Sequence, residues 1–316
     1  MGKLLWGLAV CASVVAACAA DDRPSAPVPR IRLDKAALDG KVKETLKSLG
    51  RGVRISVWLG GLEGEPWYAW QETASRPVAS SIKTAYLVEL FAAHAGQLDD
   101  PLPGAAELLA DDAHPAWAPF SKEERVEVRN TLRQASVRRV GEIMMGKAKA
   151  PNSVYNAAAN LTTAVLGGPE ELTKKIHKRN PSFRGIKAGR YMLAKRTEKN
   201  ENVATAAGLA AVLRLVSTGQ WDGLDEDTAT AIREAMLVSD SDPAGKHYRK
   251  GGDLNSNPLT VVRSGWYERD GQTIVYVVVA VQPEPGNRSA KEAKQRLDDT
   301  AQSLRSELLT AARAAK

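Results

Sequence analysis

The sequence predicts an α+β fold with two lobes. Strand-like segments occur near both ends of the chain, whereas amphipathic helical patterns dominate the middle. The order is helix, two strands, many helices, three strands and a final helix. The terminal segments could therefore build one antiparallel sheet with the first and last helices on one face, while the middle helices form an all-α lobe. We expect an active site in the cleft between the lobes.

The first 30 residues show export features. A positively charged start precedes the apolar run Leu4–Val15, which has the length of a signal-peptide core and is too short to span a bilayer comfortably. The following Ala-Ala-Cys18 resembles a bacterial lipobox, in which the cysteine is lipidated and becomes the first mature residue. We therefore expect a signal peptide over residues 1–17, lipidation at Cys18, a Pro-rich tether over 18–30 and anchoring to the cell envelope.

Ordinary secretion, with cleavage after Ala17 or Ala20, is the alternative for this segment. The chain contains only Cys11 and Cys18, and Cys11 would leave with the signal. A mature exported chain with one cysteine has no intramolecular disulfide, so its core must supply the stability.

The composition indicates which classes of binding partner the chain favours. The net charge is +7 and the 44 Lys and Arg residues are spread along the chain, which suits solubility among anionic envelope polymers. No basic motif interleaved with aromatics indicates nucleic-acid binding. The four histidines show no metal-ligand spacing, so we expect no metal and no cofactor. We expect a monomer whose only membrane contact is the lipid anchor.

The predicted domain covers residues 31–316, with a sheet lobe over 31–75 and 245–316 and a helical lobe over 76–244. Apolar spacing of three and four predicts helices, and β-branched or aromatic runs with Gly-rich turns predict strands. In chain order, we expect a helix over Leu33–Leu49, a hairpin over Arg54–Trp70, a helix from Ser80 to about His94, a connection over Asp99–Phe120, and helices over Glu123–Gln134, Ser136–Gly146, Tyr155–Leu166 and Pro169–Lys178.

The second half reads in the same way. Gly219 is a suitable C-cap for one helix, and Asp270-Gly271 forms a hairpin turn before the last strand. We expect an irregular basic segment over Asn180–Asn202, helices over Val203–Thr218 and Asp225–Val238, strands over Tyr248–Lys250, Leu259–Val262 and Thr273–Val281, and a closing helix over Ser289–Ala315.

The run Ser80-Ser81-Ile82-Lys83 carries the strongest chemical signal. It lies where the strands give way to an apolar helix, and positions i and i+3 of a helix share a face. A helix start favours an oxyanion, and a desolvated lysine beside a serine can lose its proton and act as a base. A serine N-cap followed by a surface lysine is the structural alternative.

From about Leu33 to the C-terminus the chain resembles the penicillin-recognising serine hydrolases, and class A β-lactamases most closely. The resemblance rests on several motifs in the family's order, and it implies a two-lobed β-lactamase/DD-peptidase-like fold with a five-stranded antiparallel sheet. The motifs are Pro77–Lys83, Asn156–Leu161, Gly167-Gly-Pro169 with Leu172-Thr173, and Tyr248–Gly252.

The resemblance also implies roles. Ser80 is the acylated nucleophile, Lys83 its general base, and Asn156 reaches both the substrate amide and Lys83. Lys250 attracts the substrate carboxylate, and its charge favours the neutral form of Lys83. The backbone N–H groups of Ser80 and Asp253 form the oxyanion hole.

Further substrate contacts are expected from Tyr155, Gly251 and Gly252. Arg263-Ser264-Gly265 is a rival for the third motif, but Lys250 leaves two strands before the last helix, as the family requires.

Three departures bear on activity. Val154 stands where the family has a serine that relays a proton, although the hydroxyl of Ser153 or Tyr155 could replace it. Gly251 lacks the hydroxyl that binds a carboxylate. The segment Leu172–Thr197, which corresponds to the Ω-loop, contains no Asp or Glu to activate water, so deacylation should be slow.

Two acids follow that segment, Glu198 and Glu201, and we expect them to be the acidic start of the next helix. Three functions stay open. The first is a β-lactamase-like hydrolase acylated by β-lactams or by a peptidoglycan stem peptide. The second is a D-Ala-D-Ala carboxypeptidase-like enzyme, and the third is an inactive lipoprotein that binds a muropeptide or a partner.

Overall fold

The computed structural model describes residues 32–197, 199–219, 221, 223–240, 245–284 and 288–315. The chain from Ile31 to Lys316 forms one compact unit. Cys18, the expected signal peptide and the expected tether lie outside the described residues, as does Glu198. Within the described ranges, no helix combines the length and the apolar character that crossing a membrane would need.

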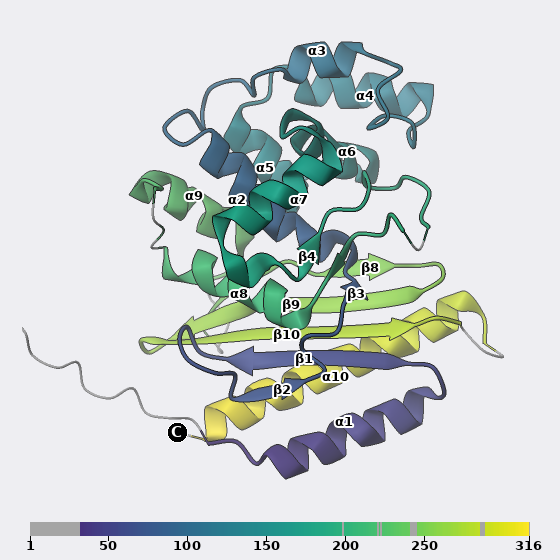
Figure 1. The fold of residues 1–316 in the computed structure, drawn as a ribbon, viewed down its shortest axis with the longest axis vertical. Helices are drawn as coiled ribbons and strands as arrows, with labels where there is room; N and C mark the ends of the chain where they lie inside the picture. Colours follow the sequence, from purple (N-terminus) through teal and green to yellow (C-terminus); the bar gives the residue numbers. More distant parts are fainter. Residues whose placement is uncertain are drawn as a thin grey trace, which may run out of the picture. The chain divides into compact units, whose positions relative to one another are not determined.

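One large antiparallel sheet runs through the unit (Figure 1). The long hairpin of its last two full-length strands occupies the centre, and the first strand joins the hairpin from the other end of the sequence. In spatial order, the strands are β2 (Tyr68–Trp70), β1 (Arg54–Gly60), β10 (Gln272–Gln282), β9 (Leu259–Arg269), β7 (Lys246–Arg249) and β6 (Leu237–Ser239), and β8 (Gly252–Leu254) also pairs with β9.

The sheet contains seven strands rather than the expected five. Strands β7 and β8 succeed one another along β9, with Tyr248 opposite Trp266 and Asp253 opposite Val261, so together they fill one position. The short edge strand β6 is the real addition. It takes Leu237 and Val238, the last two residues of the expected helix, because the backbone of Leu237 is extended (φ −65°, ψ 123°).

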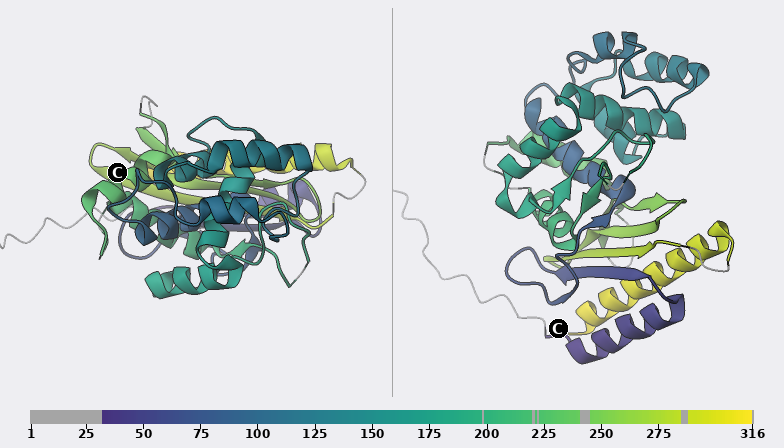
Figure 2. Two further views of the ribbon diagram at one scale, coloured as in Figure 1. Left: turned by 90° about the horizontal axis from the view of Figure 1, so that it is seen from above. Right: turned by 45° about the vertical axis from the view of Figure 1, so that its right-hand side comes forward.

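Both faces of the sheet are buried, which explains why residues 274–281 of β10 form an unbroken apolar run. Val275, Val277 and Val279 pack with the helical lobe. Tyr276 and Val278 pack against α1 (Lys35–Leu49) and α10 (Ala290–Ala314). These two helices lie together on one face of the sheet in Figure 1 and in the right-hand view of Figure 2.

The other face carries the helical lobe, as predicted. Its helices are α2 (Lys83–Ala93), α3 (Ala105–Ala110), α4 (Lys122–Leu132), α5 (Val137–Met145), α6 (Asn152–Val165), α7 (Gly168–Arg179), α8 (Ala206–Thr218) and α9 (Glu226–Met236). Helix α3 lies within the expected Asp99–Phe120 connection, where no helix was predicted.

A second, small sheet corrects the reading of residues 180–204. Its strands are β3 (Arg76–Pro77), β5 (Val203–Ala204) and β4 (Ile186–Lys187), and a 3₁₀ helix covers Pro181–Phe183. Helix α8 therefore starts after Thr205, whose hydroxyl caps Gly208 N, and not at Val203. The pairing of β3 with β5 joins the segment before Ser80 to the end of the basic segment.

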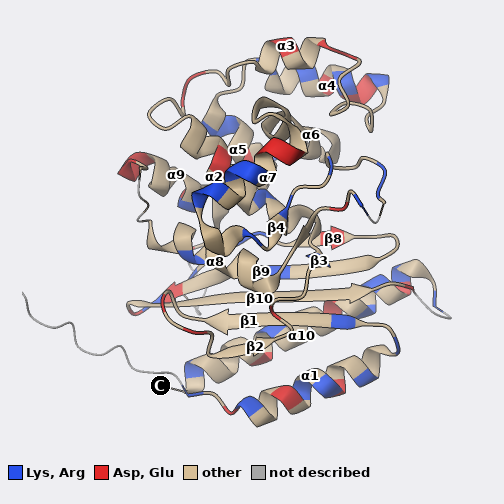
Figure 3. Ribbon diagram, in the orientation of Figure 1, with Lys and Arg blue, Asp and Glu red and all other residues tan. Residues whose placement is uncertain are grey.

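Lys and Arg are distributed over both lobes, on α1, α7, β9 and α10 among other elements (Figure 3). Many of them lie on exposed helix surfaces beside acids, as in the pairs of Lys174 with Glu170 and Glu171. Exposed pairs of this kind contribute about 0–1 kcal/mol each, so the stability of the unit depends on its two apolar cores.

Candidate active site

Ser80 lies at the only break in a long buried segment. It belongs to a 3₁₀ helix, Ala79–Ile82, that leads directly into α2. From Val78 to Phe91, every residue except Ser80 is buried. Ala79 adopts a left-handed backbone conformation (φ 47°), a strained state for a residue with a Cβ atom. Among the described residues the Ser80 hydroxyl has no hydrogen-bond partner, so it is free to meet a ligand.

Lys83 lies directly beneath this opening and is completely buried. Its Nζ donates to Asn156 Oδ1 at 3.1 Å and to the Tyr155 carbonyl oxygen at 3.4 Å. Burial, and then the charge of Lys250, hold the pKa of the Lys83 amine well below its ordinary value. Both effects favour the neutral amine, which a general base requires.

Tyr155 lies between the two lysines. Its hydroxyl accepts a 2.6 Å hydrogen bond from Lys250 Nζ, which also donates to the Met145 carbonyl oxygen at 3.0 Å. Its ring lies beneath Lys83, with Nζ 3.3 Å from the ring centroid. Tyr155 therefore connects the expected base to the expected cation, while the Ser153 hydroxyl forms no hydrogen bond with a described residue.

Helix α6 explains this arrangement. It starts at Asn152, three residues earlier than expected, so that Val154, Tyr155 and Asn156 occupy its first turns. Val154 is buried in the helical lobe, and Asn156 turns toward Lys83. The amide nitrogen of Asn156 donates to the Asn152 carbonyl oxygen at 2.9 Å and to Asn152 Oδ1 at 3.1 Å. Asn156 thus contacts Lys83 as expected. Its amide nitrogen is hydrogen-bonded to Asn152, although we expected Asn156 also to reach the substrate amide.

The break between β7 and β8 forms the opposite wall. The carbonyl oxygen of Lys250 accepts hydrogen bonds from Ser81 Oγ at 3.1 Å and Ser264 Oγ at 2.6 Å, which ties the strand to the 3₁₀ helix. A Cβ atom at Gly252 would lie 2.6 Å from Val78 O and 2.8 Å from Ser80 N. Only glycine permits this close approach.

Arg263, the rival cation, is bonded to acids on the α10 side of the site and not to Tyr155 or Lys83. Its guanidinium group contacts Asp298 on α10 and Asp253 at 3.2 Å, toward the face that α10 covers. Lys250, in contrast, is the cation beside Tyr155 and Lys83.

A pocket of about 560 Å³ opens over these groups. Of the expected residues, Ser80, Tyr155, Gly251, Gly252 and Asp253 line it directly. Lys83, Asn156 and Lys250 lie buried behind its wall. The other lining residues are Asn152, Arg249, Asn255, Arg263, Ser264, Tyr276, Gln302 and Arg305. No group of three or more His, Cys, Asp or Glu within the described ranges could hold a metal ion.

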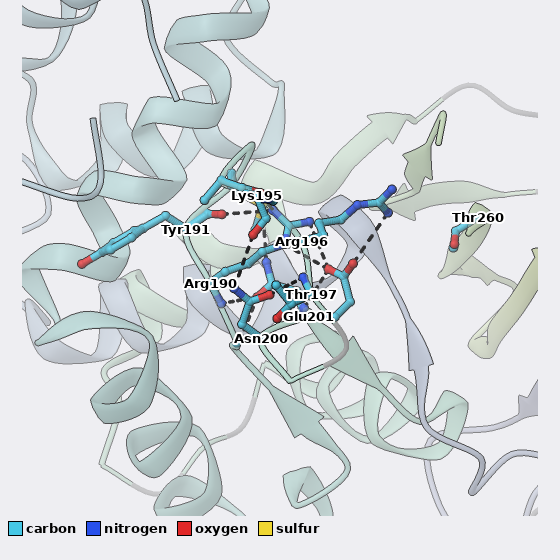
Figure 4. Close-up of polar contacts among 12 residues, drawn as sticks. Arg190, Tyr191, Lys195, Arg196, Thr197, Asn200, Glu201 and Thr260 are labelled. Carbon is cyan, nitrogen blue, oxygen red and sulfur yellow. Dashed lines mark hydrogen bonds and ion pairs between the residues drawn. The ribbon is translucent and has the colours of Figure 1, made fainter. Parts of the chain in front are cut away.

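The basic segment is held by its own ion pairs. Figure 4 shows the carboxylate of Glu201 between the guanidinium groups of Arg190 and Arg196. Both Glu201 and Arg190 are about nine-tenths buried, and their closest atoms are 3.0 Å apart. The expectation that Glu201 starts a helix is therefore wrong. Its carboxylate is engaged in the loop, and Glu201 does not line the Ser80 pocket.

Met192 lies where this segment meets α6. Asn160 Oδ1 accepts from Met192 N at 2.5 Å, and Asn160 Nδ2 donates to Met192 O at 3.2 Å. Asn160 lies one helical turn beyond Asn156, so this contact places Met192 near the base of the site. Its buried thioether cannot accept a proton from water. Sequence reasoning missed this anchor, although Asn160 within an apolar helix was an available signal.

Comparison with known proteins supports the fold. No family model matches the sequence, and no curated protein matches it. Among solved structures, a variant of the last common ancestor of Gram-negative bacteria class A β-lactamase is similar with a TM-score of 0.62 and 17% identity, covering 86% of this chain and 98% of that one. A second such mutant gives 0.62 and 17%, covering 85% and 97%. A third gives 0.61 and 16%, covering 84% and 95%. The chain therefore has the β-lactamase-like fold.

Proposed function

We propose that this chain is a serine hydrolase that is acylated at Ser80 by β-lactams or D-Ala-D-Ala-type peptides and deacylates slowly. The observation that carries the proposal is a fully buried lysine of lowered pKa beneath the one accessible residue of its segment. The β-lactamase-like fold supports it independently, and residues of the three expected motifs meet at one pocket or directly behind its wall.

The reaction follows from the residues present. Neutral Lys83 accepts the Ser80 proton as Oγ bonds to the carbonyl carbon of the ligand. Backbone N–H groups of Ser80 and Asp253 stabilise the oxyanion. When the tetrahedral intermediate collapses, the C–N bond breaks and the Tyr155 hydroxyl donates a proton to the leaving nitrogen. Lys250, hydrogen-bonded to that hydroxyl, stabilises the tyrosinate formed.

The next step lacks a base. Hydrolysis of the acyl-enzyme requires a group that activates water, a contribution of about 10²–10⁴-fold. Met192, the loop residue that is hydrogen-bonded to Asn160 of α6, has no side-chain group that could take a proton from water. The carboxylate of Glu201 is held in ion pairs with Arg190 and Arg196. We therefore expect fast acylation followed by slow turnover.

A binding protein without catalysis is the second candidate. It is favoured by the hydrogen bonds of Lys83 Nζ, which go to Asn156 and Tyr155 and not to Ser80. A D-Ala-D-Ala carboxypeptidase is a variant of the first proposal, with the stem peptide as acyl donor.

Incubation with a fluorescent penicillin, followed by intact-mass measurement, separates these cases. A stable adduct of one equivalent supports slow deacylation, rapid turnover supports an efficient lactamase, and no adduct supports the binding protein. Ser80→Ala should abolish labelling. Ser81→Ala is the matched control, because Ser81 is buried and its hydroxyl donates to the Lys250 carbonyl oxygen. Labelling lost only in Ser81→Ala would refute the assignment of the nucleophile.

We further propose that the mature protein is a lipid-anchored monomer on the envelope side of a bacterial membrane. Cys18→Ser should then release it from the membrane fraction, because the lipidated cysteine would be its only anchor. Unchanged fractionation would exclude lipidation at Cys18.

A further inference from the structure

The pocket does not end at the catalytic groups. Ser80, Asn152 and Tyr155 line its part on the helical-lobe side, and Arg249 and Arg305 line its part on the α10 side. The ridge between the two parts is Gly251-Gly252, where β7 gives way to β8. Residues of both parts line one pocket, so an elongated ligand can extend from Ser80 to the α10 side.

The α10 part carries positive charge without counter-charge. Arg263 is ion-paired with Asp253 and Asp298, and Lys294 also pairs with Asp253. Arg249 and Arg305, in contrast, form no ion pair with any residue that the structure describes. The acids nearest to this part are therefore already engaged.

Arg305 is also incompletely hydrogen-bonded. Its Nε is buried and has no hydrogen-bond partner among the described atoms. Its guanidinium carbon lies 5.9 Å from the ring centroid of Tyr276, another lining residue. A buried donor without an acceptor is unfavourable, so the protein alone does not satisfy this guanidinium group. The neutral amides of Gln302 and Asn255 lie in the same wall and can orient such a group.

We propose that Arg249 and Arg305 form an anion-binding subsite for the distal end of the ligand that is acylated at Ser80. The group bound is a carboxylate or a phosphate ester, because a planar guanidinium presents paired donors that match both. The identity of that ligand rests on the proposed function. The volume of the whole pocket, about 560 Å³, suits a short peptide or a sugar–peptide fragment rather than a macromolecule.

The first test uses Ser80→Ala protein, so that it does not depend on acylation. Inorganic phosphate is titrated by isothermal calorimetry at low and fixed ionic strength. Arg249→Gln and Arg305→Gln should each weaken binding at least about tenfold, since a hydrogen bond to a charged group is lost. Lys291→Gln is the control, because it removes the same charge from an exposed position on α10 and should leave the affinity unchanged.

The second test distinguishes the sources of the anion. Two acyl-D-Ala-D-Ala peptides that differ only by a distal carboxylate or carboxamide are titrated against the same variants. Tighter binding of the carboxylate, lost in Arg305→Gln, assigns the subsite to the peptide, whereas phosphate binding without this preference assigns it to a phosphate ester.

No site-dependent binding of either anion, or equal loss in Lys291→Gln, overturns the subsite. Penicillin labelling of the parent protein is scored separately. A failure to label with intact anion binding would reject the proposed function and leave the subsite standing.

Discussion

Substitution of Gly252 by alanine tests whether the close approach of β8 positions the nucleophile. The new Cβ atom would lie 2.6 Å from Val78 O and 2.8 Å from Ser80 N, about 0.6–0.8 Å inside ordinary van der Waals contact at 3.4 Å. Both contacts are backbone atoms, so the 3₁₀ helix or β8 must move by that amount. Overpacking of this kind typically costs about 1–3 kcal/mol of stability. A displacement approaching 1 Å at a reacting group costs about 10²-fold in rate.

We therefore expect Gly252→Ala to slow acylation by a fluorescent penicillin about 100-fold and to lower Tm by several degrees. Gly251→Ala is the control, since its Cβ would lie 3.1 Å from Val262 O and 3.4 Å from Arg263 and would not meet Ser80. The rate constant is read from the time course of intact-mass labelling, and Tm from circular dichroism. Parent-like acylation and Tm in Gly252→Ala would show that this contact does not position Ser80.

Three other predictions concern the proton transfers and the basic segment. The acylation rate should fall as pH falls, because Lys83 must be neutral, and the midpoint of the pH–rate profile should lie below 10.5. Lys250→Met should move that midpoint to higher pH, because it removes the neighbouring charge that lowers the pKa of Lys83. An unmoved midpoint would contradict this coupling of the two lysines. Tyr155→Phe should slow acylation about 10²-fold or more while leaving that midpoint nearly unchanged, since it removes only the hydroxyl, and an unchanged rate would exclude Tyr155 as proton donor. Glu201→Gln should destabilise the protein by roughly 3 kcal/mol in urea denaturation, because it leaves the buried charge of Arg190 unpaired. The rate of deacylation should not change, and a large loss of turnover would identify Glu201 as a relocated base.

The sheet and helices were largely predictable because their burial is regular. The apolar run at residues 274–281 of β10 and the apolar spacing of the first and last helices are local patterns, and the structure confirms β10, α1 and α10. The fold class followed from the order of those elements. The division of one strand position into β7 and β8 was not predictable, since it results from the contact of Gly252 with Ser80, which lies far away in the sequence.

The site was predictable in its residue types and less so in its geometry. The spacing of Ser80 and Lys83 pointed to the correct end of α2, but the 3₁₀ turn depends on the left-handed conformation of Ala79, which alanine seldom adopts. The contacts of Tyr155 with Lys250 and of Glu201 with Arg190 and Arg196 are tertiary and could not be read from the sequence. Sequence left Ser153 and Tyr155 equivalent, and the start of α6 at Asn152 distinguishes them.

The pairing of β1 with β10 bears on how the protein is made. It brings Arg54 opposite Val281, so that the helical lobe is inserted in the sequence between two strands that are neighbours in the sheet. Contacts so distant in sequence make folding slow, because a large loop must close before they form. A growing chain that already contains Ser80 still lacks Lys250, Gly252 and both strands of the central hairpin. The residues that surround Ser80 in the folded protein are therefore complete only when synthesis is nearly finished, and the proposed reactivity would be acquired in the last stage of assembly.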